Sequence, residues 1–374
     1  MESIDWKKLA PHRPLRPSDP LYVSRPFGGG ERLAALLKSG LGPITVAGPA
    51  GIGKSTELAA AARVLHPHSV ACLIPLDRFL DVRQAEEEAV QRCIAGRLAE
   101  LAIVDFRLGL SEALVTSLVR GGSLPEDLLP SSASGLWEPP ASWRDVLIAT
   151  IREVAKLSSQ GRVTLLLDGV EKAPVDASLR AVRALLDLGD EANLALVVPL
   201  ALVTGPEAHE LLSETRLFSI RALPVREQLG AGWSEARQFL FEVAERRLGL
   251  GSGIAEIQPL FDAAADMSGG IPRTFLQLLQ DAGGYAALAG RRMPTVKEDL
   301  FSAALDHHES LRRLLRDGDD AVLNLADGSP GLEVPLDRRI RFVSQGLLLE
   351  YDLNNRVVVH PHPLLQPPAE YLPP

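Results

Sequence analysis

The residues best suited to chemistry form one glycine-rich run: Gly48, Pro49, Ala50, Gly51, Ile52, Gly53, Lys54, Ser55 and Thr56. Its G-x-x-x-x-G-K-[ST] spacing is typical of a loop that binds nucleotide phosphates. The glycines let the backbone point several N–H groups at one phosphate, and a helix beginning near Lys54 adds its positive end. The pattern predicts that Lys54 contacts the β- and γ-phosphates and that Ser55 helps to hold Mg²⁺.

The elements around this run support the prediction. The β-branched segment 44–47 precedes the turn, and an alanine-rich segment follows it to about Leu65. This order predicts a strand, a phosphate loop and a helix. The alternative is an ordinary glycine turn that joins a strand to a helix.

A second chemical signal is an acidic strand end. The apolar run 163–167 leads into Asp168 and, three residues later, Glu171. A continuous apolar run is typical of a buried parallel strand, and a carboxylate at its carboxyl end can hold Mg²⁺ through water. Asp168 is therefore predicted to complete the metal site, and Glu171 could orient the attacking water. The alternatives are a turn residue for Asp168 and a surface acid for Glu171.

Another apolar run, 193–205, is predicted to be a buried strand with Thr204 at its end. Thr204 then lies near the γ-phosphate or simply caps the turn before Gly205. Four or five strands alternating with helices predict a doubly wound α/β domain, with a parallel sheet. Helices are predicted over 81–101, 143–157 and 207–213, and in the last part of the chain over 297–305 and 310–325. From Trp233 onward the pattern is helical, and segments 347–351 and 356–360 predict a hairpin that makes the last part a winged helix.

These patterns predict four parts. Residues 1–20 form an N-terminal arm, 21–226 the nucleotide-binding domain, 227–292 a helical lid and 293–374 a winged-helix domain. The irregular segment 121–142 is interpreted as a mobile insertion, with a partner-binding loop as the alternative.

The composition of the chain indicates its number of domains, its cellular compartment and its possible partners. The chain has 374 residues, of which 46% are hydrophobic and 23% charged, which suits two or three globular domains. Two cysteines, no export signal and no apolar run of about 18–20 residues favour a cytoplasmic protein without a membrane span. The net charge of −9 disfavours a large nucleic-acid surface. The predicted winged helix carries Arg338, Arg339 and Arg341, so DNA contact and protein docking both stay open.

The motifs in this order resemble the AAA+/STAND class of P-loop ATPases, especially prokaryotic members close to the origin-recognition initiators. The resemblance rests on the phosphate loop and on three further segments: Tyr22-Val23-Ser24-Arg25, Asp168-Gly169-Val170-Glu171 and Gly270-Ile271-Pro272-Arg273. It implies ATP and Mg²⁺ as ligands.

The resemblance also implies roles for single residues. Tyr22, Val23 and Arg25 would lie over the nucleotide. Pro272 would lie near the base and Arg273 near the phosphates, while Arg216 would reach into a neighbouring subunit of a homo-oligomer. Gly169 departs from the pattern, because many relatives have a catalytic glutamate directly after the aspartate.

This departure favours slow hydrolysis and a nucleotide-dependent switch that signals to a protein partner through the lid and winged helix. Two other hypotheses stay open: a DNA-binding or DNA-loading ATPase, and a non-hydrolysing ATP-bound scaffold in a bacterial conflict or signalling system. The chain has no N-K-x-D motif for guanine, which favours ATP over GTP.

Overall fold

The computed structural model describes residues 4–11, 15–84, 86–129, 131, 139–204, 213–229, 232–250, 256–320, 323, 334–353 and 356–366. The chain divides into two compact units. The first unit consists of Met1–Gly29, Gly48–Thr56 and Ile220–Pro374. The second consists of Gly30–Ala47 and Glu57–Ser219.

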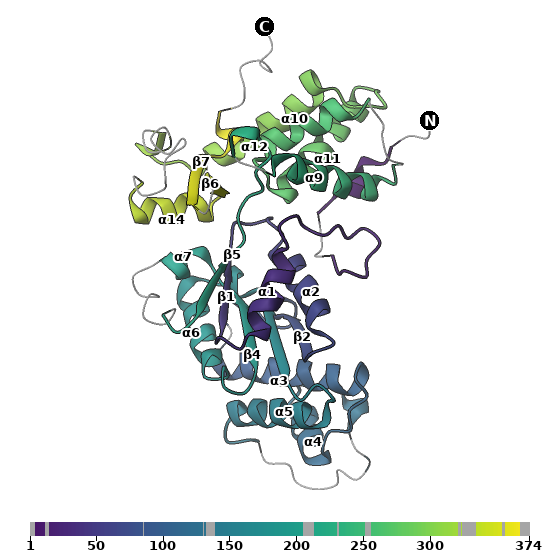
Figure 1. The fold of residues 1–374 in the computed structure, drawn as a ribbon, viewed down its shortest axis with the longest axis vertical. Helices are drawn as coiled ribbons and strands as arrows, with labels where there is room; N and C mark the ends of the chain where they lie inside the picture. The colour runs from purple at the N-terminus through teal and green to yellow at the C-terminus, as the bar shows by residue number, and fades with distance from the viewer. Residues whose placement is uncertain are drawn as a thin grey trace. The chain divides into compact units, whose positions relative to one another are not determined.

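The second unit is built on a parallel five-stranded sheet in the order β2-β3-β4-β1-β5 (Figure 1). Its strands are β1 (Ile44–Ala47), β2 (Val70–Pro75), β3 (Val163–Asp168), β4 (Asn193–Val197) and β5 (Arg216–Ser219). Every residue of β1 and β3 is buried, as expected for strands with both faces covered. The predicted doubly wound α/β class is therefore confirmed.

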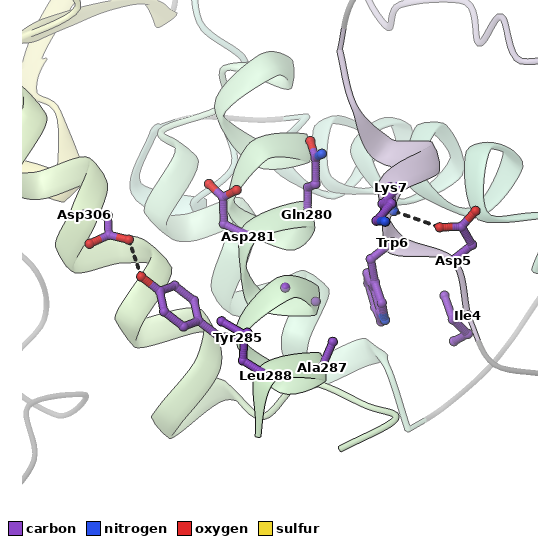
Figure 2. Close-up of a pocket in the computed structure, with 12 residues that line it drawn as sticks. Ile4, Asp5, Trp6, Lys7, Gln280, Asp281, Tyr285, Ala287, Leu288 and Asp306 are labelled. Atoms are coloured by element: carbon purple, nitrogen blue, oxygen red, sulfur yellow. Dashed lines mark hydrogen bonds between the residues drawn. The ribbon is translucent and has the colours of Figure 1, made fainter. Parts of the chain in front are cut away.

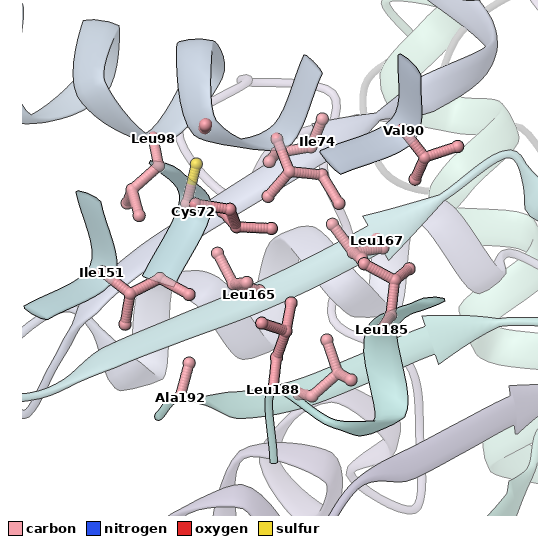
Figure 3. Close-up of a cluster of buried hydrophobic side chains, with 14 of the residues drawn as sticks. Cys72, Ile74, Val90, Leu98, Ile151, Leu165, Leu167, Leu185, Leu188 and Ala192 are labelled. Carbon is pink, nitrogen blue, oxygen red and sulfur yellow. The ribbon is translucent and has the colours of Figure 1, made fainter. Parts of the chain in front are cut away.

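Helices alternate with these strands. They are α1 (Gly29–Lys38), α2 (Lys54–Leu65), α3 (Glu87–Val104), α4 (Glu112–Arg120), α5 (Trp143–Leu157), α6 (Val175–Leu186) and α7 (Leu200–Thr204). Figure 3 shows apolar side chains of α3, α5 and α6 beside those of β2 and β3. Cys72 belongs to this core, and burial raises the pKa of its thiol to about 12, so it stays protonated. Cys72 thus acts as a packing residue.

The first unit is mostly helical. It contains η1 (Trp6–Leu9), α9 (Trp233–Leu248), α10 (Gln258–Ser268), α11 (Pro272–Leu288), η6 (Val296–Leu300), α12 (Phe301–Arg312), α14 (Leu336–Ser344) and η7 (Pro363–Leu365). Its core gathers Phe241, Phe261 and Phe275. Trp6 and Leu9 are buried in the same core, so the segment predicted to be an N-terminal arm contributes to it.

The C-terminal hairpin is confirmed. Strands β6 (Leu348–Leu353) and β7 (Arg356–Pro361) pair antiparallel, with Leu348 opposite Pro361. The predicted turn residues 354 and 355 lie outside the described residues. A winged helix, which the hairpin and α14 suggest, stays a prediction, as do the boundaries between the four predicted parts.

Three sequence predictions differ from the structure. β4 ends at Val197, and α7 follows Pro199, which has no N–H to continue a strand ladder. The predicted strand 193–205 is therefore wrong beyond Val197. α3 begins at Glu87 rather than near Asp81, and α12 ends at Arg312, inside the helix predicted over 310–325.

Two further predictions fall partly outside the described residues. Of the predicted insertion 121–142, residues 130 and 132–138 lie outside them, and the described part contains η3 (Glu126–Leu128). A predicted helix over 207–213 also lies almost wholly outside them. None of the described helices is long and apolar enough to cross a membrane.

Candidate functional site

The phosphate loop connects β1 to α2 as predicted. Gly51 and Gly53 have φ values of 79° and 104°, which only glycine adopts without strain. Residues that alternate between right-handed and left-handed conformations form a concave nest of backbone N–H groups that suits an anion. At Gly48, a Cβ atom would lie 2.4 Å from the Ile220 carbonyl oxygen, so this position requires glycine because of close packing. The loop is therefore built for the geometry that phosphate binding needs.

Lys54 begins α2 and folds back over the loop. Its Nζ donates to the carbonyl oxygens of Gly48 at 2.9 Å and Pro49 at 3.1 Å. Ser55 and Thr56 follow in the first turn of α2 and are half-buried, while Ile52 is fully buried and Ala50 is exposed. The ammonium group and the positive end of α2 both belong to this loop.

Arg25 ties the loop to the chain that follows the sheet. Its guanidinium donates to the Ile52 carbonyl at 2.7 Å and to the Arg221 carbonyl at 2.8 Å, and the side chain is only 9% exposed. The two residues before Ser24 behave differently. Val23 packs into the helical core, and the Tyr22 carbonyl accepts a hydrogen bond from Arg246. Within this motif, Arg25 contacts the loop directly.

Arg273 also contacts the phosphate loop. It follows Pro272, the first residue of α11, and its backbone N–H donates to the Gly51 carbonyl at 3.3 Å. A Cβ atom at Gly51 would lie 2.6 Å from the Arg273 Cβ and 3.1 Å from its Cδ. The stem of the arginine therefore lies against Gly51 of the phosphate loop.

Asp168 lies at the carboxyl end of β3, opposite Pro75. The side chain is 6% exposed, and its Oδ1 is buried with no hydrogen-bond partner among the described residues. A buried carboxylate oxygen without a partner is costly, and a hydrated Mg²⁺ is a ligand that would satisfy it. Because β3 and β1 run parallel, Asp168 lies at the same sheet edge as Ala47, the residue before the phosphate loop.

Glu171 is held by its own turn. Its Oε2 accepts a hydrogen bond from the Gly169 N–H at 3.0 Å. Gly169 has a φ of 96°, and a Cβ atom there would lie 2.5 Å from Oδ1 of Asp77, which pairs with Lys172. A glutamate directly after Asp168 would therefore be strained and would collide with Asp77.

The remaining predicted residues lie elsewhere. Thr204 belongs to the helix α7, so the prediction that it lies at the end of a strand is wrong. Its side chain lies outside the described residues. Arg216 is exposed at the start of the edge strand β5, at the sheet edge opposite to the one that carries Asp168.

The three arginines of α14 have partners inside the first unit. Arg339 pairs with Glu350 at 2.6 Å, and Arg341 pairs with the nearly buried Asp319. Burial alone would raise the pKa of Asp319, but the hydrogen bonds from Arg341 and from the Arg316 N–H together outweigh it, so the pKa is lowered. Arg338 donates to the Gly318 carbonyl at 3.5 Å. Two of the three charges are therefore offset within the fold.

Sequence reasoning missed the residues that join the loop to the hairpin. The side chain of Arg221 pairs with Asp352, and the Ala222 N–H donates to the Glu350 carbonyl at 3.0 Å. The Tyr351 hydroxyl donates to the Gly269 carbonyl at 2.8 Å. The Gly269-Gly270 pair was the available signal for a tight corner, whereas nothing in the sequence points to Tyr351 as its partner.

Comparison with known proteins defines the class of fold. The sequence matches no family model and no curated protein. A Walker-type ATPase of Pyrococcus abyssi is similar in structure, with a TM-score of 0.54 and 13% identity over 95% of this chain and 98% of that one. The chain therefore has the fold of a Walker-type ATPase, as its resemblance to P-loop ATPases predicted.

Two origin-recognition proteins of Aeropyrum pernix have lower scores. They are ORC2, in ADPNP–ADP complexes (TM-score 0.47, 14% identity, 97% of this chain and 95% of that one), and ORC1, in complex with DNA (0.45, 16%, 97% and 94%). Both scores lie below 0.5, so the assignment of the fold rests on the first structure alone.

Proposed function

We propose that this protein is an ATP-binding switch that hydrolyses ATP slowly and signals to a protein partner through its C-terminal hairpin. The observation that carries the proposal is the set of contacts joining the phosphate loop, through Arg25 and Arg221, to β6. Its free cysteines, Cys72 and Cys93, suit the cytoplasm.

In this proposal Lys54 and the loop N–H groups bind the phosphates of ATP. Ser55 and Asp168 hold Mg²⁺, which neutralises charge on the phosphates. The nest at Gly51 and Gly53 and the orphaned oxygen of Asp168 support these roles. Tyr22, Val23 and Pro272 are proposed to lie toward the base.

Slow turnover follows from the turn after β3. Gly169 occupies the position that carries a catalytic glutamate in many AAA+ enzymes, and the local geometry does not accept a larger residue there. Glu171, the acid that would replace it, accepts a hydrogen bond from its own turn. We propose that Glu171 orients water only after this hydrogen bond opens, which keeps ATP bound for longer.

The switch requires contacts that differ between ATP and ADP, and a γ-phosphate supplies them. Arg273 lies against Gly51, so a charge that attracts Lys54 and Arg273 would pull the start of α11 toward the loop. Three residues before Arg273, Gly270 follows the carbonyl that Tyr351 binds. Movement at the loop is thus proposed to reach β6 through Gly269 and, separately, through Arg221.

Hydrogen–deuterium exchange of residues 348–361 tests the proposal. With Mg²⁺ and a non-hydrolysable ATP analogue, we expect slower exchange in this hairpin than with Mg·ADP. Lys54→Ala should remove the difference by preventing binding, and Arg221→Gln should reduce it while leaving nucleotide affinity within about threefold of wild type. Equal exchange in both nucleotides, with binding verified by calorimetry, would rule out the switch.

Ion pairing of Arg339 and Arg341 speaks against direct reading of DNA by α14. Phosphate release measured with and without DNA would distinguish this alternative. Stimulation by DNA that Arg339→Glu abolishes would favour a DNA-linked ATPase over the proposed switch.

A further inference from the structure

Acidic side chains gather at two places in the described part of the chain. In the first unit, Asp281 and Asp306 line a cavity of about 550 Å³ (Figure 2), and both carboxylates have a partner within the unit. In the second unit, Asp77, Asp168 and Glu171 lie at or just after the ends of β2 and β3. This second group includes the buried, unpartnered oxygen of Asp168, so the fold alone does not satisfy its polar atoms.

Asp77 lies at the same edge of the sheet as Asp168. It belongs to η2 (Leu76–Arg78), a short turn of helix directly after β2. The register of the parallel strands places Pro75, the last residue of β2, opposite Asp168, the last residue of β3. Asp77 follows this paired position by two residues, so both carboxylates lie at the carboxyl end of the sheet, where α/β folds bind their ligands.

The carboxylate of Asp77 fills the space beside Gly169. A Cβ atom at Gly169 would lie 2.5 Å from Oδ1 of Asp77 and 3.0 Å from its Cβ. Gly169 directly follows Asp168 in the chain. The Asp77 carboxylate therefore lies over the turn after β3, where a side chain of residue 169 would otherwise stand.

Lys172 holds one oxygen of this carboxylate. Its Nζ donates to Oδ2 of Asp77, whereas Oδ1 accepts no hydrogen bond from the described residues. The Asp77 side chain is 23% exposed, so water reaches it. Asp77 thus presents one oriented oxygen that is available to a water molecule.

Glu171, the other acid of this turn, is already engaged. Its Oε2 accepts a hydrogen bond from the Gly169 N–H at 3.0 Å. Hydrolysis of a phosphate ester by general base catalysis needs an acceptor for a proton of the attacking water. Asp77 can accept this proton without any rearrangement of the turn, whereas Glu171 would first have to release Gly169.

We infer that Asp77 is a catalytic carboxylate in the hydrolysis of ATP, an inference that rests on the function proposed above. Oδ1 of Asp77 accepts a hydrogen bond from the attacking water, whose oxygen forms a bond to the γ-phosphorus. The bond between this phosphorus and the β–γ bridging oxygen breaks, and its electron pair leaves with ADP. One proton of the water passes to Asp77 and from there to solvent. Asp77 supports slow turnover while Glu171 stays bound to Gly169, and Glu171 contributes once that hydrogen bond opens.

Single-turnover release of phosphate from Mg·ATP, measured on the full chain, tests this role. Asp77→Asn should slow release about tenfold or more because it removes the proton acceptor, and Glu171→Gln should slow it less than about threefold. Asp81→Asn removes the same charge from an exposed residue nearby and should leave the rate unchanged. Circular dichroism verifies that the variants fold.

Nucleotide affinity distinguishes this role from that of a metal ligand. In calorimetry with Mg²⁺ and a non-hydrolysable ATP analogue, Asp77→Asn should bind within about threefold of wild type, whereas Asp168→Asn should bind about tenfold more weakly. An equal loss of affinity in the two variants would make Asp77 part of the metal site and overturn the inference.

Formate provides a readout that a purely structural role would not change. Asp77→Ala leaves space beside Gly169 for this small carboxylate, so added formate should raise the rate of the variant about fivefold or more. Sodium chloride at equal ionic strength should not raise it. Lys54→Ala should not respond to formate, because it does not bind ATP.

Two kinds of failure can be told apart. Release at the wild-type rate by Asp77→Asn, or no response of Asp77→Ala to formate, would overturn the inference and leave the proposed function intact. A wild-type protein that binds Mg·ATP but shows no phosphate release dependent on Lys54 would overturn both the inference and the hydrolysis proposed above.

Discussion

Two glycine turns in the first unit precede helices and share a backbone conformation, yet they have different surroundings. Gly51 and Gly53 precede α2, while Gly269 and Gly270 precede α11, and all four have positive φ. The first turn is surrounded by Lys54, Arg25 and Arg273. The second turn is packed tightly against other residues of the chain.

The packing of the second turn is close at every position. The Tyr351 hydroxyl binds the Gly269 carbonyl, and the Gly270 N–H donates to the Ser268 hydroxyl at 3.1 Å. A Cβ atom at Gly270 would lie 1.9 Å from the Leu223 carbonyl oxygen. A glycine turn before a helix is thus a candidate anion site only where cations converge on it, and otherwise it is a packing device.

The largest effect is expected from Gly270→Ala. The methyl group would overlap a backbone oxygen and strain a positive φ, so the free energy of unfolding should fall by about 4 kcal/mol or more. Thermal unfolding followed by circular dichroism measures the loss. Gly284→Ala is the matched control and should not destabilise, because its Cβ meets open space. Equal stability of the two variants would show that the second turn is not closed by packing.

Lys54→Ala should reduce ATP affinity about 100-fold, or about 3 kcal/mol, because the phosphates lose a charge-assisted hydrogen bond. Calorimetric titration with Mg·ATP measures the change. Lys38→Ala, at the end of α1, removes the same charge elsewhere and should have little effect. If Lys54→Ala binds ATP as tightly as wild type, the first turn is not a phosphate-binding site, and it does not differ in function from the second turn.

The closed turn should also make stability depend on pH. His362 precedes Pro363, which packs on Gly269, and burial lowers the pKa of His362 to about 3. The unfolded chain, with a pKa near 6.5, binds the proton first, so stability is complete above about pH 6.5 and falls as the pH drops toward 3. We expect a loss of about 2 kcal/mol between pH 7 and pH 5 that His362→Gln removes. Urea unfolding at both pH values tests this, and an identical pH dependence in the variant would contradict it.

Tyr351→Phe should have the smallest effect, about 1 kcal/mol, because it removes one buried hydrogen bond without changing volume. Chemical denaturation measures it, and Tyr285→Phe, which loses a more exposed hydrogen bond, should cost less. If Tyr351→Phe is as stable as wild type, the contact with Gly269 does not stabilise the turn.

Local patterns predicted much of the fold. The phosphate loop, β3, α5 and the hairpin are each marked by a pattern of neighbouring residues, such as glycine spacing or a short apolar run. The kind of element and its position can therefore be predicted from the sequence. The failure at Thr204 has a local cause: an apolar run continues past Pro199, although the strand cannot.

Other features depend on residues far apart in the chain. Gly283 decides where Trp6 packs, Asp319 pairs with Arg341, and Tyr351 closes the turn at Gly269. No spacing rule joins such partners. The candidate site divides in the same way, because its glycines and Lys54 were predictable while the bridge from Arg25 to Arg221 was not.

Gly169 has a consequence for the history of the protein. A single substitution to glutamate would put a β-carbon where the backbone has positive φ and where Asp77 already stands. A glutamate at position 169 is therefore not one mutation away, since position 77 would have to change as well. If the protein hydrolyses ATP as proposed, selection for faster turnover through this position would require two coordinated changes.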